Sequence, residues 1–286
     1  MPIDVNQVLN YKFKTIEFSW DEDKVILYHL GIGAGTDWLS ADELRYTYEK
    51  NLHVLPSYGV LPSLDAMPDI VSSELLESVN PHKIVHGEHE LVMHQALPVK
   101  AQVFTDSRVE GVYGKGSGVL LVIESETRLK NSNDLLATNR WSLFLRGAEA
   151  DTTVEAPDTS VAYPEREPDF ALETPIIPQL SQIYRLSGDK VAFHVDPDVA
   201  KMAGFDTPIM HGLCTYGVVC KAIVDSCAGG DVSRLKSFRG RFVSPAFCGQ
   251  TIVTKIWKDD DGYLVQADSK ESGQVLFTAA VAKFKD

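Results

Sequence analysis

The sequence has few cysteines, an excess of acidic over basic residues and no long apolar run. Lysine and arginine total 27 against 40 aspartate and glutamate, a net charge of −13, which argues against nucleic acid and anionic membranes as partners. None of the four cysteines forms a C-x-x-C pair, so we expect reduced core cysteines of an intracellular protein and no metal centre. They are Cys214, Cys220, Cys227 and Cys248.

Targeting and membrane segments are not evident either. The start, MPIDVNQVLNYKFK, lacks the cationic and apolar parts of a secretory signal, and the last residues, KFKD, differ from the S-K-L peroxisomal signal. The apolar run GVLLVI at 118–123 has strand length, whereas a membrane span needs ~18–20 residues. We therefore expect a globular protein that does not enter a membrane.

The length and one proline-rich segment predict two domains. With 286 residues, 44% of them apolar, the chain can bury two cores of roughly 130–150 residues each. Residues 148–179 contain five prolines among acidic and small residues and show neither helical nor strand periodicity. We expect an N-terminal domain at 1–147, an extended linker at 148–179 and a C-terminal domain at 180–286.

The two halves show a faint internal repeat. LPVKAQVFT, GVLLVIESETRL and ATNRWSLFLRG in the first half correspond to SPAFCGQTIVTKIW, YLVQADSK and VLFTAAVAKF in the second. Each set is β-rich with Gly, Asn or Asp at the corners, which predicts an antiparallel meander. A helical stretch precedes each meander and in the second half covers about Gly212–Cys227 before AGG. The predicted class is α+β, a helix laid against a curved antiparallel sheet, twice.

The stretch YRLSGDKVAFHVDP, residues 184–197, contains a candidate catalytic pair. Asp189 and His194 could share one water, take a proton from it and return one to a neighbouring carbon. Asp196 is expected to cap a short helix, and a longer helix is expected to start near Gly212, where unpaired amides could bind a developing oxyanion. On spacing alone, an ordinary structural loop is the alternative.

The same region resembles a known family. YRLSGDKVAFHVDPDVAKMAGFDTPIMHGLCTYG is similar to the signature of the MaoC-like, (R)-specific enoyl-CoA hydratases, also called hydratase 2. KVILYHLGIGAG, LPSYGV, VHGEHEL, KGSGVLL and WSLFLRG extend the resemblance to the first half, as in the two-domain eukaryotic peroxisomal type. The resemblance implies a double hot-dog fold and hydration of trans-2-enoyl-CoA to (3R)-3-hydroxyacyl-CoA in fatty-acid β-oxidation. It implies no cofactor, because coenzyme A is part of the substrate.

The resemblance also implies roles for individual residues. Asp189 and His194 match the acid/base pair of the family, and Gly212 matches the residue whose amide binds the thioester oxygen. Other matching positions lie around the site or further away: Tyr184, Asp196 and His211, and then Asp169, Tyr28 and Glu49. A homodimer is expected by the same resemblance, as is a peroxisomal location, with the cytoplasm as the alternative.

One position departs from the family pattern. Where the family has Asn-Pro, this chain has Val191-Ala192, and valine cannot hydrogen-bond a catalytic water. Losing such a contact costs on the order of 1–3 kcal/mol, or ~10- to 100-fold in rate if it acts in the transition state. An active hydratase therefore competes with an altered hot-dog protein that binds acyl-CoA or hydrolyses it as a thioesterase.

Two further motifs are more typical of structure than of function. LGIGAGTD has Thr36 where a dinucleotide-binding G-x-G-x-x-G needs its third glycine, and the preceding KVILYHL reads at least as well as a helix. In VHGEHELVMH, alternation puts Glu88 and Glu90 on the strand face opposite His89, which favours a strand over a metal site.

A basic stretch and a broken segment suggest how the substrate is held. RLKSFRGRF is either a strand edge protected by charge or a grip on coenzyme A phosphates through Lys236, Arg239 and Arg241. The first half has no copy of the Asp-x4-His pair, so we expect a non-catalytic domain that binds the acyl tail. Its proline-broken LPSYGVLPSLDAMPD is consistent with an interrupted central helix and with long-chain substrates.

Overall fold

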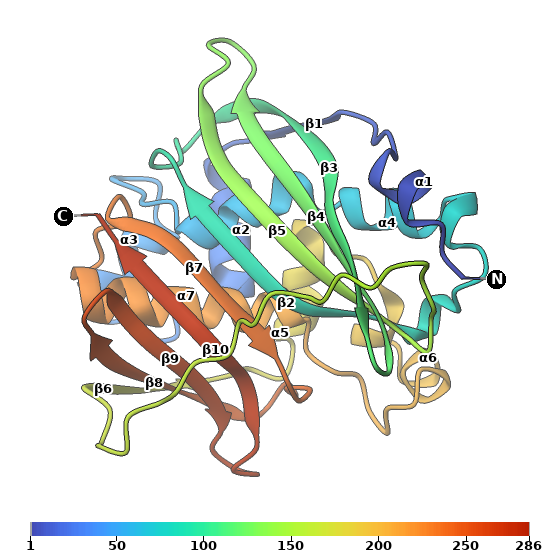
Figure 1. Ribbon diagram of the computed structural model, residues 1–286. Coiled ribbons are helices and arrows are strands. Elements are labelled where there is room, and N and C mark those ends of the chain that lie inside the picture. Colours follow the sequence, from blue (N-terminus) through green and yellow to red (C-terminus); the bar gives the residue numbers. More distant parts are fainter. Residues whose placement is uncertain (1, 286) are drawn as a thin grey trace.

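All ten strands form one antiparallel sheet. The computed structural model describes residues 2–285, and its strand order is β1-β3-β4-β5-β2-β7-β10-β9-β8-β6 (Figure 1). The first half contributes β1 (Ile16–Trp20), β2 (Ile84–Met93), β3 (Ala101–Lys115), β4 (Gly118–Leu129) and β5 (Leu135–Arg146). The second contributes β6 (Phe170–Pro175), β7 (Leu235–Phe242), β8 (Thr251–Asp259), β9 (Gly262–Ser269) and β10 (Val275–Phe284).

The predicted repeat is confirmed down to the hydrogen bonds of its turns. The meanders are β3-β4-β5 and β8-β9-β10. Asn133 and Gly273 occupy equivalent turn positions with φ of 63° and 67°, and each donates its N–H to the residue four positions earlier. Pairing of β2 with β7 joins the halves, so the two expected helix-and-sheet units share one continuous sheet.

Helices cover one face of this sheet, as Figure 1 shows. The longest is α7 (Gly212–Ala228), which lies behind the strands of the second half, with α2 (Glu22–Gly31) beside it. The longest helix among the described residues of the first half is the ten-residue α2, and the segment packed on its strands is broken into η1 (Pro56–Ser63), α4 (Ala66–Val71) and η2 (Glu74–Leu76). The remaining helices are α1 (Val5–Leu9), α3 (Ala41–Thr47), η3 (Pro81–Lys83), α5 (Leu180–Tyr184), η4 (Arg185–Ser187), η5 (Ala192–His194) and α6 (Pro197–Met202).

The helix predicted at about Gly212–Cys227 corresponds closely to α7. Eleven of its residues are buried, because small and apolar side chains recur on the faces toward the sheet and toward α2. A Cβ at Gly217 would lie 2.6 Å from Ile32 and 2.9 Å from the Tyr28 hydroxyl, so only glycine allows this approach of α2. The helix ends at Gly229, whose φ of 61° closes the last turn.

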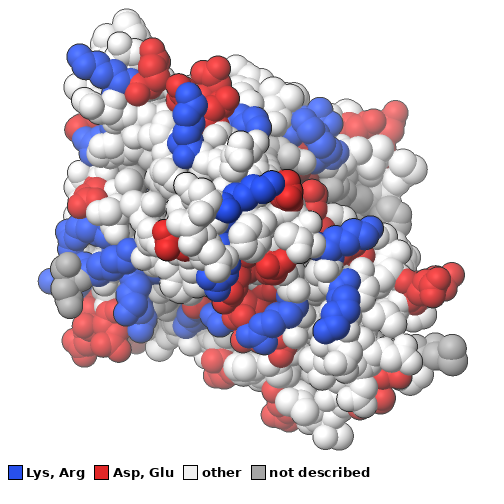
Figure 2. All heavy atoms as spheres, turned by 90° about the horizontal axis from the view of Figure 1, so that it is seen from above, with Lys and Arg blue, Asp and Glu red and all other residues white. Residues whose placement is uncertain are grey.

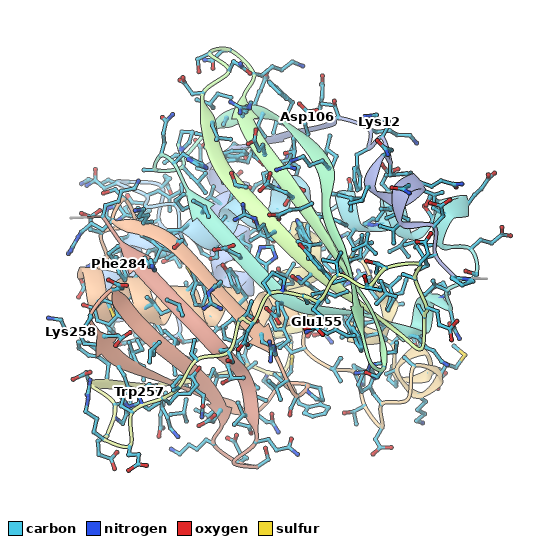
Figure 3. All side chains as sticks on the ribbon, in the orientation of Figure 1. Lys12, Asp106, Glu155, Trp257, Lys258 and Phe284 are labelled. Carbon is cyan, nitrogen blue, oxygen red and sulfur yellow. The ribbon has the colours of Figure 1, made fainter. Side chains whose placement is uncertain are left out.

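The expected linker is extended over most of its length but contains one strand. Phe170–Pro175 forms β6 at the edge of the sheet, paired with β8, so the expectation of no strand between 148 and 179 is wrong there. Residues 148–179 contain no glycine, and both ends of β6 pair with β8. Upstream, the chain crosses the face opposite the helices, and Glu155, labelled in Figure 3, bridges to Gly114 on the way.

Surface charge and helix length are the two features that concern nucleic-acid and membrane partners. Acidic and basic side chains are interspersed on the face seen in Figure 2. Within residues 2–285, none of the helices has both the length and the apolarity needed to cross a bilayer.

Candidate active site

The catalytic loop begins at a glycine that the turn requires. Gly188 has φ of 141°, a conformation that side chains disfavour, and a Cβ there would lie 2.9 Å from Leu64 of the first half. Asp189 follows, and its Oδ1 accepts the backbone N–H of Val191 at 3.2 Å. The loop therefore orients this carboxylate through a backbone contact and packs against the other domain.

His194 is placed by η5 with one ring nitrogen available. Its side chain is 8% exposed, and Nδ1 lies 2.8 Å from the carbonyl oxygen of Ile209. A carbonyl only accepts, so Nδ1 carries the proton and Nε2 carries the lone pair. One ligand atom each of Asp189, His194 and His211 lies within 4.8 Å of the others. Because two hydrogen bonds of ~2.8 Å each can span that gap, Asp189 and His194 can share one water.

Burial keeps His194 neutral. Desolvation lowers the pKa of His194 below its usual 6.5, while the Ile209 carbonyl and the Asp189 carboxylate act in the opposite direction. The imidazole is therefore unprotonated at neutral pH and can accept a proton. The nearby carboxylate can then stabilise the imidazolium that forms.

His211 lies directly against His194. The two rings stack with centroids 3.8 Å apart and planes 25° from parallel, and the Tyr184 ring packs on His211 at a centroid distance of 4.9 Å. Burial, with the neighbouring His194, lowers the pKa of His211 to about 2, while the backbone of Asp189 acts in the opposite direction. Neither ring nitrogen of His211 reaches hydrogen-bond geometry with a partner within residues 2–285. A neutral His211 ring therefore covers one face of the His194 imidazole.

Asp189, His194 and His211 are also the residues that could hold a metal ion. The geometry fits an ion poorly, because nearly parallel stacked imidazoles direct their in-plane lone pairs side by side and not toward one point. The same arrangement suits proton transfer through Nε2 of His194, because Nδ1 of that ring is held by the Ile209 carbonyl.

The sequence predicts an oxyanion site at the start of α7. His211 is its N-cap and Gly212 its first residue, so the first amides have no intrahelical acceptor and lie at the positive end of the helix dipole. The ring of Phe242 lies 3.5 Å from where a Gly212 Cβ would be. The helix therefore begins beside Asp189 and His194, with first amides that have no partner within the helix.

The other predicted residues divide between the site and its supports. Tyr184 is buried against His211, as the resemblance implies. Asp196 caps α6 through the backbone N–H groups of Asp198 and Val199, so its role is to shape the loop. The more distant matches are dispersed: Tyr28 packs in the core against Tyr184, Glu49 is exposed, and Asp169 accepts the backbone N–H of Lys258.

The basic residues of β7 do not join this site. Alternation puts Arg239 and Arg241 on the face opposite α7, where Arg239 donates to the carbonyl of Thr159 and Arg241 binds Glu88 and the Thr159 hydroxyl. Lys236 is exposed on the same strand. Because β7 pairs with both β2 and β10, the alternative of a sheet edge protected by charge is wrong.

Exposed apolar side chains occur on the segments that carry the site, which the sequence does not predict. Four of them are 43–75% exposed: Leu186, Val191, Met202 and Val243. Leu186 and Val191 flank Asp189 in the sequence, Met202 ends α6 and Val243 follows β7. Single exposed apolar residues are common on protein surfaces, so they define no further site.

The fold is that of a double hot-dog protein, and a carboxylate and an imidazole lie close together near a helix N-terminus. The description "MFE-2 hydratase 2 N-terminal domain" matches residues 18–147 and "MaoC like domain" matches 159–279. A solved structure from Mycobacterium tuberculosis described as a double hot-dog fold has a TM-score of 0.57 over 96% of both chains, at 13% identity, which shows the fold alone.

Closer similarity places the chain in a family. It is 35% identical to "Enoyl-CoA hydratase ChsH3" of Mycobacterium tuberculosis over 91% of both chains. It is 32% identical to "Enoyl-CoA hydratase 2, peroxisomal" of Arabidopsis thaliana, covering 96% of this chain and 93% of that one. A MaoC-like dehydratase structure from Phytophthora capsici has a TM-score of 0.85 at 32% identity over 98% of both chains. The chain belongs to the MaoC-like hydratase 2 family, in its two-domain form.

Proposed function

We propose that this chain is an enoyl-CoA hydratase, which adds water to trans-2-enoyl-CoA to give (3R)-3-hydroxyacyl-CoA and catalyses the reverse dehydration in β-oxidation. The observation that carries the proposal is the approach of Asp189 and His194 within 4.8 Å, beside the first amide of α7. The names of the relatives support the same substrate class.

The proposed reaction uses groups already in place. Nε2 of His194 takes a proton from the water shared with Asp189 as the water oxygen bonds to C3. The electrons of the C2=C3 bond move to the thioester oxygen, where the Gly212 amide stabilises the negative charge. The imidazolium, stabilised by the Asp189 carboxylate, then protonates C2 and closes the cycle. Every proton comes from water or His194, so the proposal includes no cofactor and no metal.

Val191 leaves one interaction of the family site unfilled. Its backbone N–H still binds the Asp189 carboxylate, but its side chain is 43% exposed and apolar and cannot orient the water. The proposed enzyme therefore works with two polar side chains at the water where its family uses three, and we expect a reduced rate.

The direct test is purified protein with crotonyl-CoA, followed by loss of the enoyl-thioester absorbance and by the configuration of the product. The expected product is the (3R)-hydroxy thioester. If crotonyl-CoA and longer 2-enoyl-CoAs remain unchanged while acyl-CoA binds measurably, the chain is a binding protein and not a hydratase. Release of free coenzyme A would indicate a thioesterase.

We also propose that the first half binds the acyl tail, that long chains are accepted and that two chains form a homodimer. The interrupted segment η1–α4–η2 supports the first two, since it replaces a continuous helix over the first half of the sheet. A rate that falls steadily from C4 upward would contradict long-chain use. Sedimentation would test the dimer.

The proposed location is the peroxisome, which is supported by peroxisomal relatives. Fluorescent tagging in the source cell would test it.

A further inference from the structure

A bulge in β2 turns two histidines toward the same side of the sheet. Simple alternation is confirmed for Glu88 and Glu90, which bind Arg241 and Arg140 on the outer face, whereas His89 is buried. The β2–β5 register shifts between His86 and Glu88, so Gly87 is an extra residue. That residue reverses the direction of His86, which then lies on the inner face with His89. Bulges re-aim side chains in this way beside functional sites.

His86, His89 and Trp141 form one cluster of rings. Their centroids are 5.3 Å (His86–His89), 5.0 Å (His86–Trp141) and 4.7 Å (His89–Trp141) apart. His89 is 1% exposed and Trp141 is fully buried. Nonetheless His86 Nε2, His89 Nδ1 and Trp141 Nε1 have no hydrogen-bond partner anywhere in the described part of the chain.

The cluster lies next to the oxyanion site. His86 packs on Phe242 at 5.2 Å, and Phe242 is the ring that lies against Gly212. His89 packs on Tyr216, one turn further along α7, at 5.1 Å. His86 and Phe242 are half-buried whereas His89 and Trp141 lie behind them, so the cluster extends inward from the accessible side of the site.

The unpaired nitrogens offer a donor and an acceptor without charge. Asn139 donates its amide to the Gly59 carbonyl, so its oxygen faces His89 and accepts from Nε2, which leaves Nδ1 of His89 as an acceptor. Trp141 Nε1 can only donate. Burial lowers the pKa of His86 to about 4 and that of His89 further, so both rings are neutral. A hydroxyl, which donates and accepts, matches this set, whereas a carboxylate finds no positive charge on the three rings.

We propose that His86, His89 and Trp141 form a subsite for a hydroxyl group on the acyl chain of the substrate, beyond the reacting C2=C3 bond. The subsite rests on the proposed hydratase function for the identity of its ligand. Polar atoms buried without partners are rare in folded proteins, and a bound hydroxyl would pair them. The enzyme would then prefer hydroxylated over plain acyl chains of the same length.

The first experiment measures binding without turnover. Saturated acyl-CoAs of one chain length, plain or hydroxylated at successive carbons beyond C4, are titrated against the wild-type protein by calorimetry. One hydroxylated member should bind about tenfold more tightly than the plain chain. The matching 2-enoyl-CoAs should show the same preference in kcat/KM. Equal affinity across the whole series would overturn the proposal and indicate that bound water pairs the three nitrogens instead.

Variants then assign the preference to the cluster. Trp141→Phe removes the donor and keeps a ring, and His86→Leu removes a nitrogen at a half-buried position where folding is less at risk. Both should abolish the hydroxyl preference while the plain chain binds as before. Ser142→Ala, on the same strand but the opposite face, is the control and should keep the preference.

The outcomes separate the two proposals. If both variants lose affinity equally for plain and hydroxylated chains, the cluster contacts the pantetheine part of the ligand, and the hydroxyl subsite is rejected. A hydroxyl preference in binding with no turnover of any enoyl-CoA would instead retain the subsite and reject the hydratase function.

Discussion

The two halves of the molecule share a sheet pattern and differ in what covers it. Their meanders repeat the same turn hydrogen bonds, from Asn133 to Leu129 in one and from Gly273 to Ser269 in the other. Over the second half lies the 17-residue α7, whereas the first half is covered by the shorter η1, α4 and η2. The strands are thus equivalent and the covering layers are not.

This difference places the candidate site at the helix of the second half. A long helix that begins at Gly212 gives the second half an oriented amide and dipole beside Asp189 and His194. In the first half every residue of η1 is buried, and the Gly59 carbonyl is held by Asn139 of the sheet. The first half therefore closes the core and supports the site, and five changes should break or sharpen the contrast.

The largest effect is expected at the acid. Asp189→Asn keeps an oxygen that can accept the Val191 amide but removes the charge that stabilises the His194 imidazolium. We expect kcat on crotonyl-CoA to fall by about 10²–10⁴-fold with an unchanged melting temperature. Asp65→Asn, an exposed carboxylate of the first half, is the matched control. Equal rates in the two variants would remove Asp189 from the mechanism.

The second change tests the contact between the halves. Lys221 of α7 binds Asp225 at 2.9 Å and Glu43 of the first half at 2.6 Å, with side chains 15–30% exposed. Burial lowers the pKa of Lys221, but the two carboxylates outweigh it and the net shift is upward. Lys221→Met leaves two part-buried carboxylates without their cation, although Gly35 and Tyr46 still donate to them, and should cost about 2–3 kcal/mol in urea unfolding. Lys201→Met, on exposed α6, should cost almost nothing.

The third prediction concerns the pH dependence of stability and His29, whose two ring nitrogens both have hydrogen-bond partners. Nδ1 of His29 donates to the Tyr46 carbonyl at 2.7 Å and Nε2 accepts the Leu55 N–H at 3.2 Å, so only the neutral ring fits. Burial lowers the pKa of His29 to about 4. The unfolded chain binds the proton first, so stability is complete above pH ~6.5 and declines toward pH 4, by about 2 kcal/mol at pH 5. His29→Gln should flatten this decline, and an unchanged slope would contradict the assignment.

The fourth change distinguishes two glycines of α7. A methyl group at Gly212 meets Phe242 at 3.5 Å, an ordinary contact, whereas one at Gly217 lies 2.6 Å from Ile32. Gly212→Ala should fold normally and lower kcat/KM about tenfold, because the methyl crowds the oxyanion amide. Gly217→Ala should instead lower stability by about 1–3 kcal/mol through overpacking. If Gly212→Ala lowered stability without lowering the rate, Gly212 would serve packing and not the oxyanion amide.

The smallest effect is expected at Val191. Val191→Asn restores the amide of the family pattern at a position 43% exposed, so stability should hardly change. The rate on crotonyl-CoA should rise up to about tenfold if the water is weakly held in the natural chain. A lower rate would mean that the site has adapted to valine.

Much of the local structure was predictable because it depends on neighbouring residues. Asp196, Pro197 and Gly204 marked the ends of α6, the AGG motif marked the end of α7, and turn residues marked both meanders. The sequence pattern also singled out Asp189 and His194. These features rest on capping, turn chemistry and periodicity, which act within a few residues along the chain.

Residues that lack such local signals were misplaced or missed. The sequence places β6 in the linker because its strand is stabilised by pairing with β8, a segment far along the chain. The paired residues Phe170 and Ile256 are 86 positions apart, and no local pattern records that contact. For Arg239 and Arg241 the sequence leaves open a grip on coenzyme A phosphates or a strand edge protected by charge, whereas Glu88 and Thr159 hold them on the outer face of a central strand. Periodicity could not tell which side of the sheet the helices would cover.

The sequence by itself determined the repeat, the helix that starts at Gly212 and the acid–imidazole pair, since local backbone preferences and side-chain chemistry specify them. Only the tertiary structure decided that β2 and β7 join the halves, that His211 stacks on His194 and that Gly87 turns His86 inward. Those arrangements depend on contacts between segments far apart in the chain, where packing and strand register select one outcome among many.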